Sequence, residues 1–222
     1  GFAGRLDPLA HGVMLLMIGE ETKSRDKYLN FDKEYEFEVL FGLSTDTYDA
    51  LGILQNGNSK PAPVNLEKQI KNFIKSKSGK QTQIYPPFSS IEVKGKQLYQ
   101  WARENKLNEI KIPEREIEIY NFPLIYIQTK PVSEIEKRIY ENINAVNGDF
   151  RQDEILEKWN EFFKKNKTIT FAIAKFKINC SSGTYVRSLA NELGQKLECG
   201  AIALSIFRTK VDKYKLEDSI KL

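Results

Sequence analysis

Apolar and polar residues alternate most regularly over residues 33–41. Every second position from Tyr35 to Phe41 is aromatic or aliphatic, and three glutamates stand beside them. A period of two is that of a β-strand, whose successive side chains point to opposite faces. We therefore predict a strand over residues 33–41 with one face toward solvent. Residues 169–180 and 201–211 have similar strand character and predict two more strands.

Apolar residues at helical spacing indicate three further regions. One helix is predicted to begin at an Asn65 N-cap and to end near Gly79, with a stripe of Leu66, Ile70, Phe73 and Ile74. Lysines crowd its other face, either as a solvated surface or as a rim that contacts phosphate. Residues 131–168 hold two helical patterns around an Asn-Gly pair and predict a helical hairpin. The stripe over residues 186–197 predicts another helix.

Shorter patterns complete the prediction of secondary structure. The apolar run over residues 13–18 predicts a buried strand, and residues 20–29 predict a short helix with acidic residues at its N-terminus. Leu98, Trp101 and Ala102 predict a second short helix. Residues 115–129 predict two strands around a break that contains proline.

Composition sets broad limits on the class of protein. A chain of 222 residues, 41% hydrophobic, can bury one sizeable core, and we expect a single domain over residues 1–222. The net charge of +4, from 34 basic and 30 acidic residues, permits a polyanionic partner without requiring one. One histidine and two cysteines supply neither a metal-ligand set nor a disulfide framework, so we expect no metal. No apolar run reaches the length of about 18 residues that spans a membrane.

Two acidic segments are candidates for chemistry. Asp7 precedes Pro8, which fixes its own φ, and this context predicts a turn from which a nucleophilic carboxylate can project. The commoner role of an Asp-Pro pair is a helix cap or an Asx-turn. In the second segment, Asp46 and Asp49 lack the spacing of an EF-hand cation loop. We assign both residues to a hydrogen-bonded acidic turn.

Four segments, in chain order, carry a resemblance to a known family. They read Gly-Arg-Leu-Asp-Pro-Leu-Ala-His-Gly-Val at 4–13 with Gly-Glu-Glu-Thr-Lys at 19–23, Thr-Asp-Thr-Tyr-Asp-Ala-Leu-Gly at 45–52, Tyr-Pro-Pro-Phe-Ser-Ser at 85–90, and Cys-Ser-Ser-Gly-Thr-Tyr-Val-Arg at 180–187. Together they resemble the TruB-type pseudouridine synthases, which isomerise a uridine in the T loop of tRNA.

The resemblance implies that Asp7 is catalytic and that Arg187 pairs with it. Local physics favours the same pairing, because Arg187 lies in the first turn of a predicted helix, where the helix dipole disfavours an unpartnered cation. Tyr35 matches the family's active-site tyrosine and is expected to stack on the flipped base. An ordinary tyrosine, with a pKa of about 10, keeps its proton at neutral pH and is a poor proton acceptor.

Three further residues are implied as contacts to substrate RNA. Phe2, which stands where family members usually have His, is expected to stack in the T loop. Lys23 is expected to contact phosphate, and Ile206 to cap the uracil pocket. The alternative reading of Lys23 is a solvated surface residue, and that of Ile206 is a core residue.

The fold implied by the resemblance is the α+β pseudouridine-synthase fold, a mixed and mostly antiparallel sheet flanked by helices with a central RNA-binding cleft. Compared with the compact form of the family, residues 131–168 represent a helical insertion. A C-terminal RNA-binding domain is not expected after residue 222. The family's strand and helix before the first motif are missing, so we expect the catalytic domain to be incomplete at its N-terminus.

The function implied is isomerisation of a T-loop uridine to pseudouridine by an aspartate nucleophile after base flipping. Because the reaction is redox-neutral, we expect no cofactor. We expect a cytoplasmic monomer that binds the T arm of tRNA, without a protein partner. One alternative is a guide-RNA-dependent relative that acts on ribosomal RNA, and another is a non-catalytic module that binds RNA or assists tRNA folding. The intact Asp7, Tyr35 and Arg187 argue against the non-catalytic module.

Overall fold

The structure is a computed structural model that describes residues 1–55 and 59–221. Its helices are α1 (Arg25–Leu29), α2 (Leu66–Lys77), α3 (Leu98–Arg103), α4 (Val132–Ala145), α5 (Gln152–Lys165) and α6 (Val186–Lys196), with 3-10 helices η1 (Gly19–Ser24), η2 (Leu107–Glu109) and η3 (Leu216–Asp218). Its strands are β1 (Phe2–Ala3), β2 (Ala10–Gly12), β3 (Leu15–Leu16), β4 (Lys33–Phe41), β5 (Ser44–Thr45), β6 (Leu54–Gln55), β7 (Gly79–Ile84), β8 (Glu92–Val93), β9 (Lys96–Gln97), β10 (Glu114–Asn121), β11 (Leu124–Pro131), β12 (Thr170–Cys180), β13 (Ala201–Val211) and β14 (Tyr214–Lys215).

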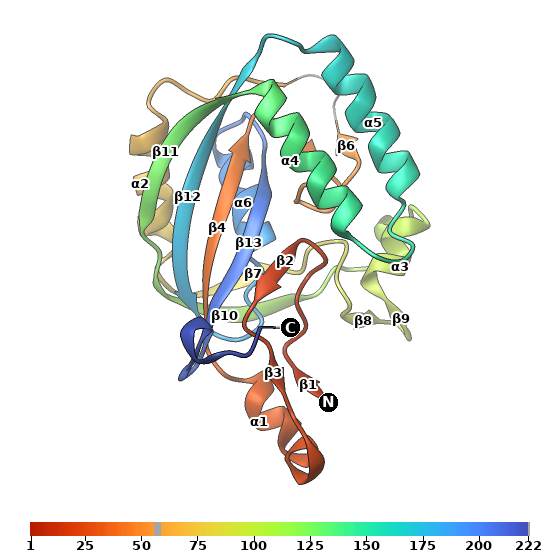
Figure 1. Ribbon diagram of the computed structural model, residues 1–222, viewed down its shortest axis with the longest axis vertical. Coiled ribbons are helices and arrows are strands. Elements are labelled where there is room, and N and C mark those ends of the chain that lie inside the picture. The colour runs from red at the N-terminus through yellow and green to blue at the C-terminus, as the bar shows by residue number, and fades with distance from the viewer. Residues whose placement is uncertain (56–58, 222) are drawn as a thin grey trace.

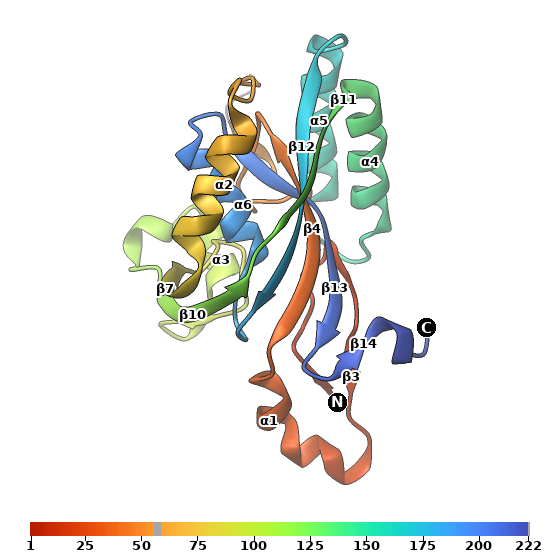
Figure 2. The ribbon, with the colours of Figure 1, turned by 90° about the vertical axis from the view of Figure 1, so that its left-hand side faces the viewer.

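One eight-stranded sheet organises the chain (Figure 1). Its main path runs β14-β13-β4-β12-β10-β7, while β11 also pairs with β12 and β2 also pairs with β13. Every pairing in it is antiparallel except that of β2 with β13. Figure 2 shows α2, α3 and α6 on one side of this sheet and α4 and α5 on the other. The predicted mixed, mostly antiparallel sheet with flanking helices is confirmed.

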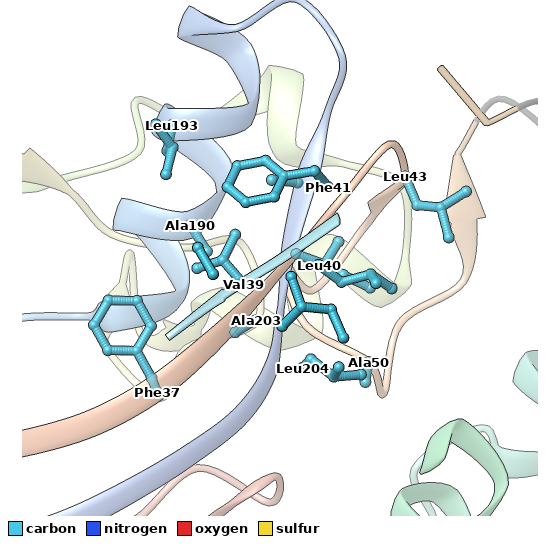
Figure 3. Packing of buried hydrophobic residues seen from close by; sticks show 14 of the residues in the cluster. Phe37, Val39, Leu40, Phe41, Leu43, Ala50, Ala190, Leu193, Ala203 and Leu204 are labelled. Carbon is cyan, nitrogen blue, oxygen red and sulfur yellow. The ribbon is translucent and has the colours of Figure 1, made fainter. Parts of the chain in front are cut away.

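Strand β4 lies at the centre of the sheet, between β13 and β12. The predicted period of two is present, and Figure 3 shows Phe37, Val39 and Phe41 in the core near side chains of α6. The second face is partly solvated and carries ion pairs. Glu36, 33% exposed, pairs with Lys175 at 2.7 Å, whereas Glu38, 12% exposed, pairs with Arg138 of α4. The alternating pattern therefore identifies the strand but not the partners that cover its polar side.

The apolar run over residues 13–18 does not form the predicted buried strand. Only Leu15 and Leu16 are extended, as β3, and they pair with the two-residue β1 outside the main sheet. Ile18 is 86% exposed, whereas Val13 and Met17 are buried. A two-stranded ribbon has no second layer to cover both of its faces, so half of this run stays in contact with solvent. The helix predicted over residues 20–29 is present, although its first half is the 3-10 helix η1.

The helix predicted after Asn65 is confirmed as α2, with Leu66, Ile70 and Phe73 buried. Asn65 occupies the N-cap position as predicted, although its side chain makes no capping hydrogen bond. Its Oδ1 instead accepts a hydrogen bond from the Gln69 side chain, one turn further along. Four of the remaining predictions, the strands β10, β11 and β12 and the helix α3, agree with the structure within a few residues.

The helical hairpin predicted within residues 131–168 is present as α4 and α5. Its aromatic residues pack on one another as expected, with the rings of Trp159 and Phe163 stacked 5.4 Å apart. They also reach the sheet, since Phe162 lies 6.3 Å from Phe171 of β12. The buried residues of both helices belong to the same apolar cluster as the sheet, so the hairpin shares the main core.

Candidate active site

Asp7 lies on a tight turn between β1 and β2. The Ala10 amide donates to the Asp7 carbonyl at 2.8 Å, with Pro8 at the second position of the turn, where its fixed φ is favourable. The predicted turn is therefore confirmed. The Asp7 side chain is 30% exposed, so it is anchored on one side and open on the other.

Arg187 lies in the first turn of α6 and holds both carboxylate oxygens of Asp7. Its Nε donates to Oδ2 at 2.8 Å and its Nη2 donates to Oδ1 at 3.0 Å. Two parallel charge-assisted hydrogen bonds fix the plane of the carboxylate as well as its position. The predicted pairing of Asp7 with Arg187 is confirmed.

The rest of the Arg187 guanidinium is tied to two loops. Nη1 donates to the Thr47 carbonyl at 2.8 Å, and Nη2 donates to the Phe88 carbonyl at 3.2 Å. The side chain is 3% exposed, so these bonds satisfy donors that water cannot reach. Arg187 thereby joins three segments of the chain that the sequence keeps far apart, and it holds Asp7 against all of them.

Asp49 provides a second carboxylate beside this guanidinium. Its Oδ2 lies 3.6 Å from Arg187 Nε, and its Oδ1 accepts from the Thr47 hydroxyl at 2.6 Å and from the Leu51 amide at 2.9 Å. The assignment of Asp49 to an acidic turn is confirmed, but its contact with Arg187 was missed. No local signal in the sequence indicates this contact, because it links residues 138 positions apart.

The charges of buried Arg187, buried Asp49 and partly exposed Asp7 act on one another. Burial opposes the charged form of Arg187, but the carboxylates of Asp7 and Asp49 outweigh it and raise the pKa of Arg187 further. Burial raises the pKa of Asp49 to about 6, against the opposing effects of Arg187 and Thr47. The site therefore sets one guanidinium against two carboxyl groups.

The raised pKa of Asp49 predicts a pH-dependent difference between the parent and D49N. From about pH 4 to pH 6 the folded parent binds more protons at this carboxyl than the unfolded chain does, so its contribution to stability falls as pH rises. The side-chain amide of D49N does not titrate in this range and keeps an oxygen acceptor. We compare the free energy of unfolding of D49N minus that of the parent at the two ends of this range. We expect this difference to be about 2 kcal/mol more favourable to D49N at pH 7 than at pH 4. Urea unfolding at both pH values measures it, and a constant difference would contradict it.

Tyr35 lies on β4, opposite Arg208 of β13 and Ile178 of β12 in the sheet register. Burial raises its pKa to about 12, the nearby Arg208 guanidinium acts against this rise, and the Asp7 carboxylate adds to it. The phenol therefore keeps its proton at neutral pH, as its ordinary pKa already suggested. Its stacking role remains a prediction.

A second tyrosine, Tyr185, precedes α6 directly and was missed by the sequence reasoning. Burial raises its pKa to about 12, and the Asp7 carboxylate adds to this rise. The Gln83 side chain of β7 holds the Tyr185 backbone through two hydrogen bonds. Its Nε2 donates to the Tyr185 carbonyl at 3.1 Å, and its Oε1 accepts from the Tyr185 backbone amide at 2.8 Å. The ring meets Tyr85 edge to face at 5.5 Å. The Arg187 guanidinium lies 6.0 Å from the centre of the Tyr185 ring, so this ring stands next to the Asp7–Arg187 pair.

The three residues expected to contact RNA lie in different environments. Phe2 is partly exposed on β1, and Lys23 is exposed on η1, where it pairs with Glu20. Ile206 is buried on β13, opposite Ala10 of β2 and within the apolar core. Their roles toward substrate remain predictions.

Across residues 1–55 and 59–221, no group of three or more His, Cys, Asp or Glu side chains is arranged to hold a metal ion. Over the same residues, no helix is both long and apolar enough to cross a membrane.

The sheet and its covering helices place the chain in the class with the pseudouridine-synthase fold. A chain in the crystal structure of a Cbf5-Nop10-Gar1 complex aligns with 97% of this chain and 41% of its own length, with a TM-score of 0.54 at 18% identity. A chain of an archaeal box H/ACA sRNP Nop10-Cbf5 complex aligns over the same share of this chain, with a TM-score of 0.50 at 16% identity. At such identities the likeness concerns the fold alone.

Sequence comparison defines the family within this class. Residues 1–145 match the family described as TruB family pseudouridylate synthase (N terminal domain). The chain is 33% identical to tRNA pseudouridine synthase B of Clostridium tetani and 31% identical to that of Opitutus terrae, in each case over 100% of its own length. It belongs to the TruB family. It spans 61% of the length of the first relative and 73% of that of the second.

Proposed function

We propose that this chain isomerises a uridine in the T loop of tRNA to pseudouridine, with Asp7 as the nucleophile. The observation that carries the proposal is the two-point hydrogen bonding of a partly exposed Asp7 by a buried Arg187. Relatives that are similar over the whole of this chain are named tRNA pseudouridine synthase B, which supports tRNA as the substrate.

The reaction moves one base from nitrogen to carbon attachment on the same sugar. The glycosidic C–N bond breaks, the uracil turns, and a C–C bond forms from the ring carbon C5 to the same sugar carbon. C5 then gives up its proton and the freed ring nitrogen N1 gains one, so no atom is gained or lost overall. Such a reaction needs a nucleophile or base at the reacting carbon. Asp7 can supply it because Arg187 stabilises its anion and fixes its direction, while its exposed side admits a nucleotide.

The target uridine must leave its stack before Asp7 can reach it. Base-modifying enzymes commonly flip the nucleotide into a pocket and read it by stacking and hydrogen bonds. In this proposal the ring of Tyr35 stacks on the flipped uracil. Phe2 enters the T loop, Lys23 contacts a phosphate and Ile206 borders the uracil pocket. Transfer RNA as the substrate implies a cytoplasmic location, and the chain acts as a monomer.

The proposal is tested with an unmodified T-arm hairpin, incubated with the protein alone. We expect pseudouridine at the T-loop uridine, detected by carbodiimide labelling and primer extension, without guide RNA or a partner protein. A hairpin with cytidine at the target position is the matched control and should give no product. Product that forms only after guide RNA and partner proteins are added would favour the guide-dependent alternative. Tight binding without product would favour the non-catalytic module.

A further inference from the structure

Arg208 of β13 is a buried cation that the proposed chemistry does not use. It is 1% exposed, and within the described part of the chain it forms no ion pair with a carboxylate. Burying a guanidinium without a counterion is costly unless its donors are satisfied. The contacts that satisfy them therefore indicate why this residue is an arginine.

The Arg208 guanidinium forms hydrogen bonds with both ends of the segment that carries Asp7. Nε donates to the Val13 carbonyl at 2.6 Å, and Nη2 donates to the Gly4 carbonyl at 2.9 Å. One planar side chain thus joins two carbonyls that lie nine positions apart, with Asp7 between them. The loop is closed at its base by charge-assisted hydrogen bonds.

The backbone of Arg208 holds the same segment. The Val13 amide donates to the Arg208 carbonyl at 2.9 Å, where β2 pairs in parallel with β13. Gly12 lies so close that a Cβ on it would stand 2.2 Å from the Arg208 oxygen, and its φ of +116° suits glycine. The loop therefore docks on Arg208 through side chain and backbone together.

We infer that Arg208 is a positioning residue that sets the approach of Asp7 to substrate, an inference that rests on the proposed function. Arg187 fixes the carboxylate from the helix side, while Arg208 fixes the loop from the sheet side. A nucleophile must be held within a fraction of an ångström, and a displacement of about 1 Å can cost about 100-fold in rate. Loss of Arg208 thus lowers turnover more than it lowers RNA affinity.

Lys33 offers a matched control inside the same buried region. It is 6% exposed, and its Nζ donates to the carbonyls of Leu29 and Phe31. Those carbonyls lie at the end of α1 and just after it, outside the loop that carries Asp7. Burial and the charge of Arg208 lower the pKa of Lys33 to about 8, so both residues belong to one electrostatic cluster. The Lys33 side chain also lies near Gly4, so K33M, which keeps an apolar side chain there, removes the buried cation while the hydrogen bonds from Arg208 to the loop remain.

The test compares R208M, R208K and K33M with the parent chain. For R208M we expect kcat on the T-arm hairpin to fall about 100-fold while KM stays within about threefold. R208K can reach one of the two carbonyls, so we expect its kcat to be about tenfold higher than that of R208M. K33M should keep kcat within about threefold of the parent value. A kcat for R208M within threefold of the parent, or an equal loss in K33M, would overturn the inference.

Hydrogen exchange provides a readout that does not depend on activity. Amides of residues 4–13 should exchange at least about tenfold faster in R208M than in the parent. The exchange rates of the β12 amides in R208M should stay as in the parent, and so should those of residues 4–13 in K33M. If the parent makes no pseudouridine, the proposed function fails, yet exchange still decides whether Arg208 holds the loop. If R208M does not fold, the comparison is made between R208K and the parent. Exchange rates of residues 4–13 and a kcat that are both unchanged in R208K would overturn the inference.

Discussion

Replacing Asp7 with Asn is expected to lower pseudouridine formation by at least about 1,000-fold while the affinity for T-arm RNA stays within about threefold of the parent. The amide keeps the shape of the side chain but is a far weaker nucleophile than a carboxylate. It also turns an NH2 group toward one of the Arg187 donors that now meet Oδ1 and Oδ2. Single-turnover conversion with excess enzyme measures the chemical step, and filter binding measures the affinity.

The control for D7N is D7E, which keeps the charge and lengthens the side chain by one methylene group. Because the loop and Arg187 fix the position of the carboxylate, we expect D7E to lose most of its turnover while it retains RNA affinity and stability. Turnover by D7N close to that of the parent would exclude Asp7 as the nucleophile. A large loss of RNA affinity in D7N would instead indicate that Asp7 serves binding.

Arg187→Ala is expected to damage both stability and turnover. The substitution leaves Asp49 buried without its cation and removes the donors to the Thr47 and Phe88 carbonyls. Breaking a buried ion pair by removing one partner typically costs about 3–5 kcal/mol. We expect the free energy of unfolding to fall by about that amount, and single-turnover conversion to fall by at least about 1,000-fold because Asp7 loses its orientation. Urea unfolding and the T-arm assay measure the two effects.

Two comparisons separate these effects of Arg187. R187K keeps a positive charge but cannot make the two-point contact, so we expect most of the stability to return while turnover remains low. Arg103, which pairs with Asp149 on the surface at 3.6 Å, serves as a surface control, and R103A should cost less than about 1 kcal/mol. Near-normal turnover in folded R187A would contradict the pairing as a requirement for catalysis.

Local patterns predicted the elements that bring the site together. The alternation over residues 33–41 gave β4, and the apolar stripe after residue 185 gave α6 with Arg187 in its first turn. The pairing with Asp7 followed from an unfavourable place for a cation and from the family resemblance. Each of these inferences depends on residues close in sequence or on a motif, and both sources are local.

Features that depend on distant contacts could not be predicted. Asp49 gave the signal of a polar turn, and nothing near it indicates a guanidinium 138 positions away. Arg208 lies within an alternating strand, and nothing near it in the sequence indicates that its side chain would be buried against two backbone carbonyls. The apolar run over residues 13–18 failed for a related reason. Hydrophobicity reports what a residue prefers, whereas burial depends on whether another layer is present to cover it.

The long reach of the Arg187 and Arg208 contacts has a consequence for biosynthesis. Asp7 leaves the ribosome well before the side chains that hold it, which lie 180 positions later and beyond. Contacts of such separation form late, because the closure of long loops must precede them. A nascent chain that has not yet released α6 and β13 therefore carries Asp7 on a turn that neither arginine holds. Under the proposed function, catalysis has to wait for the completed sheet.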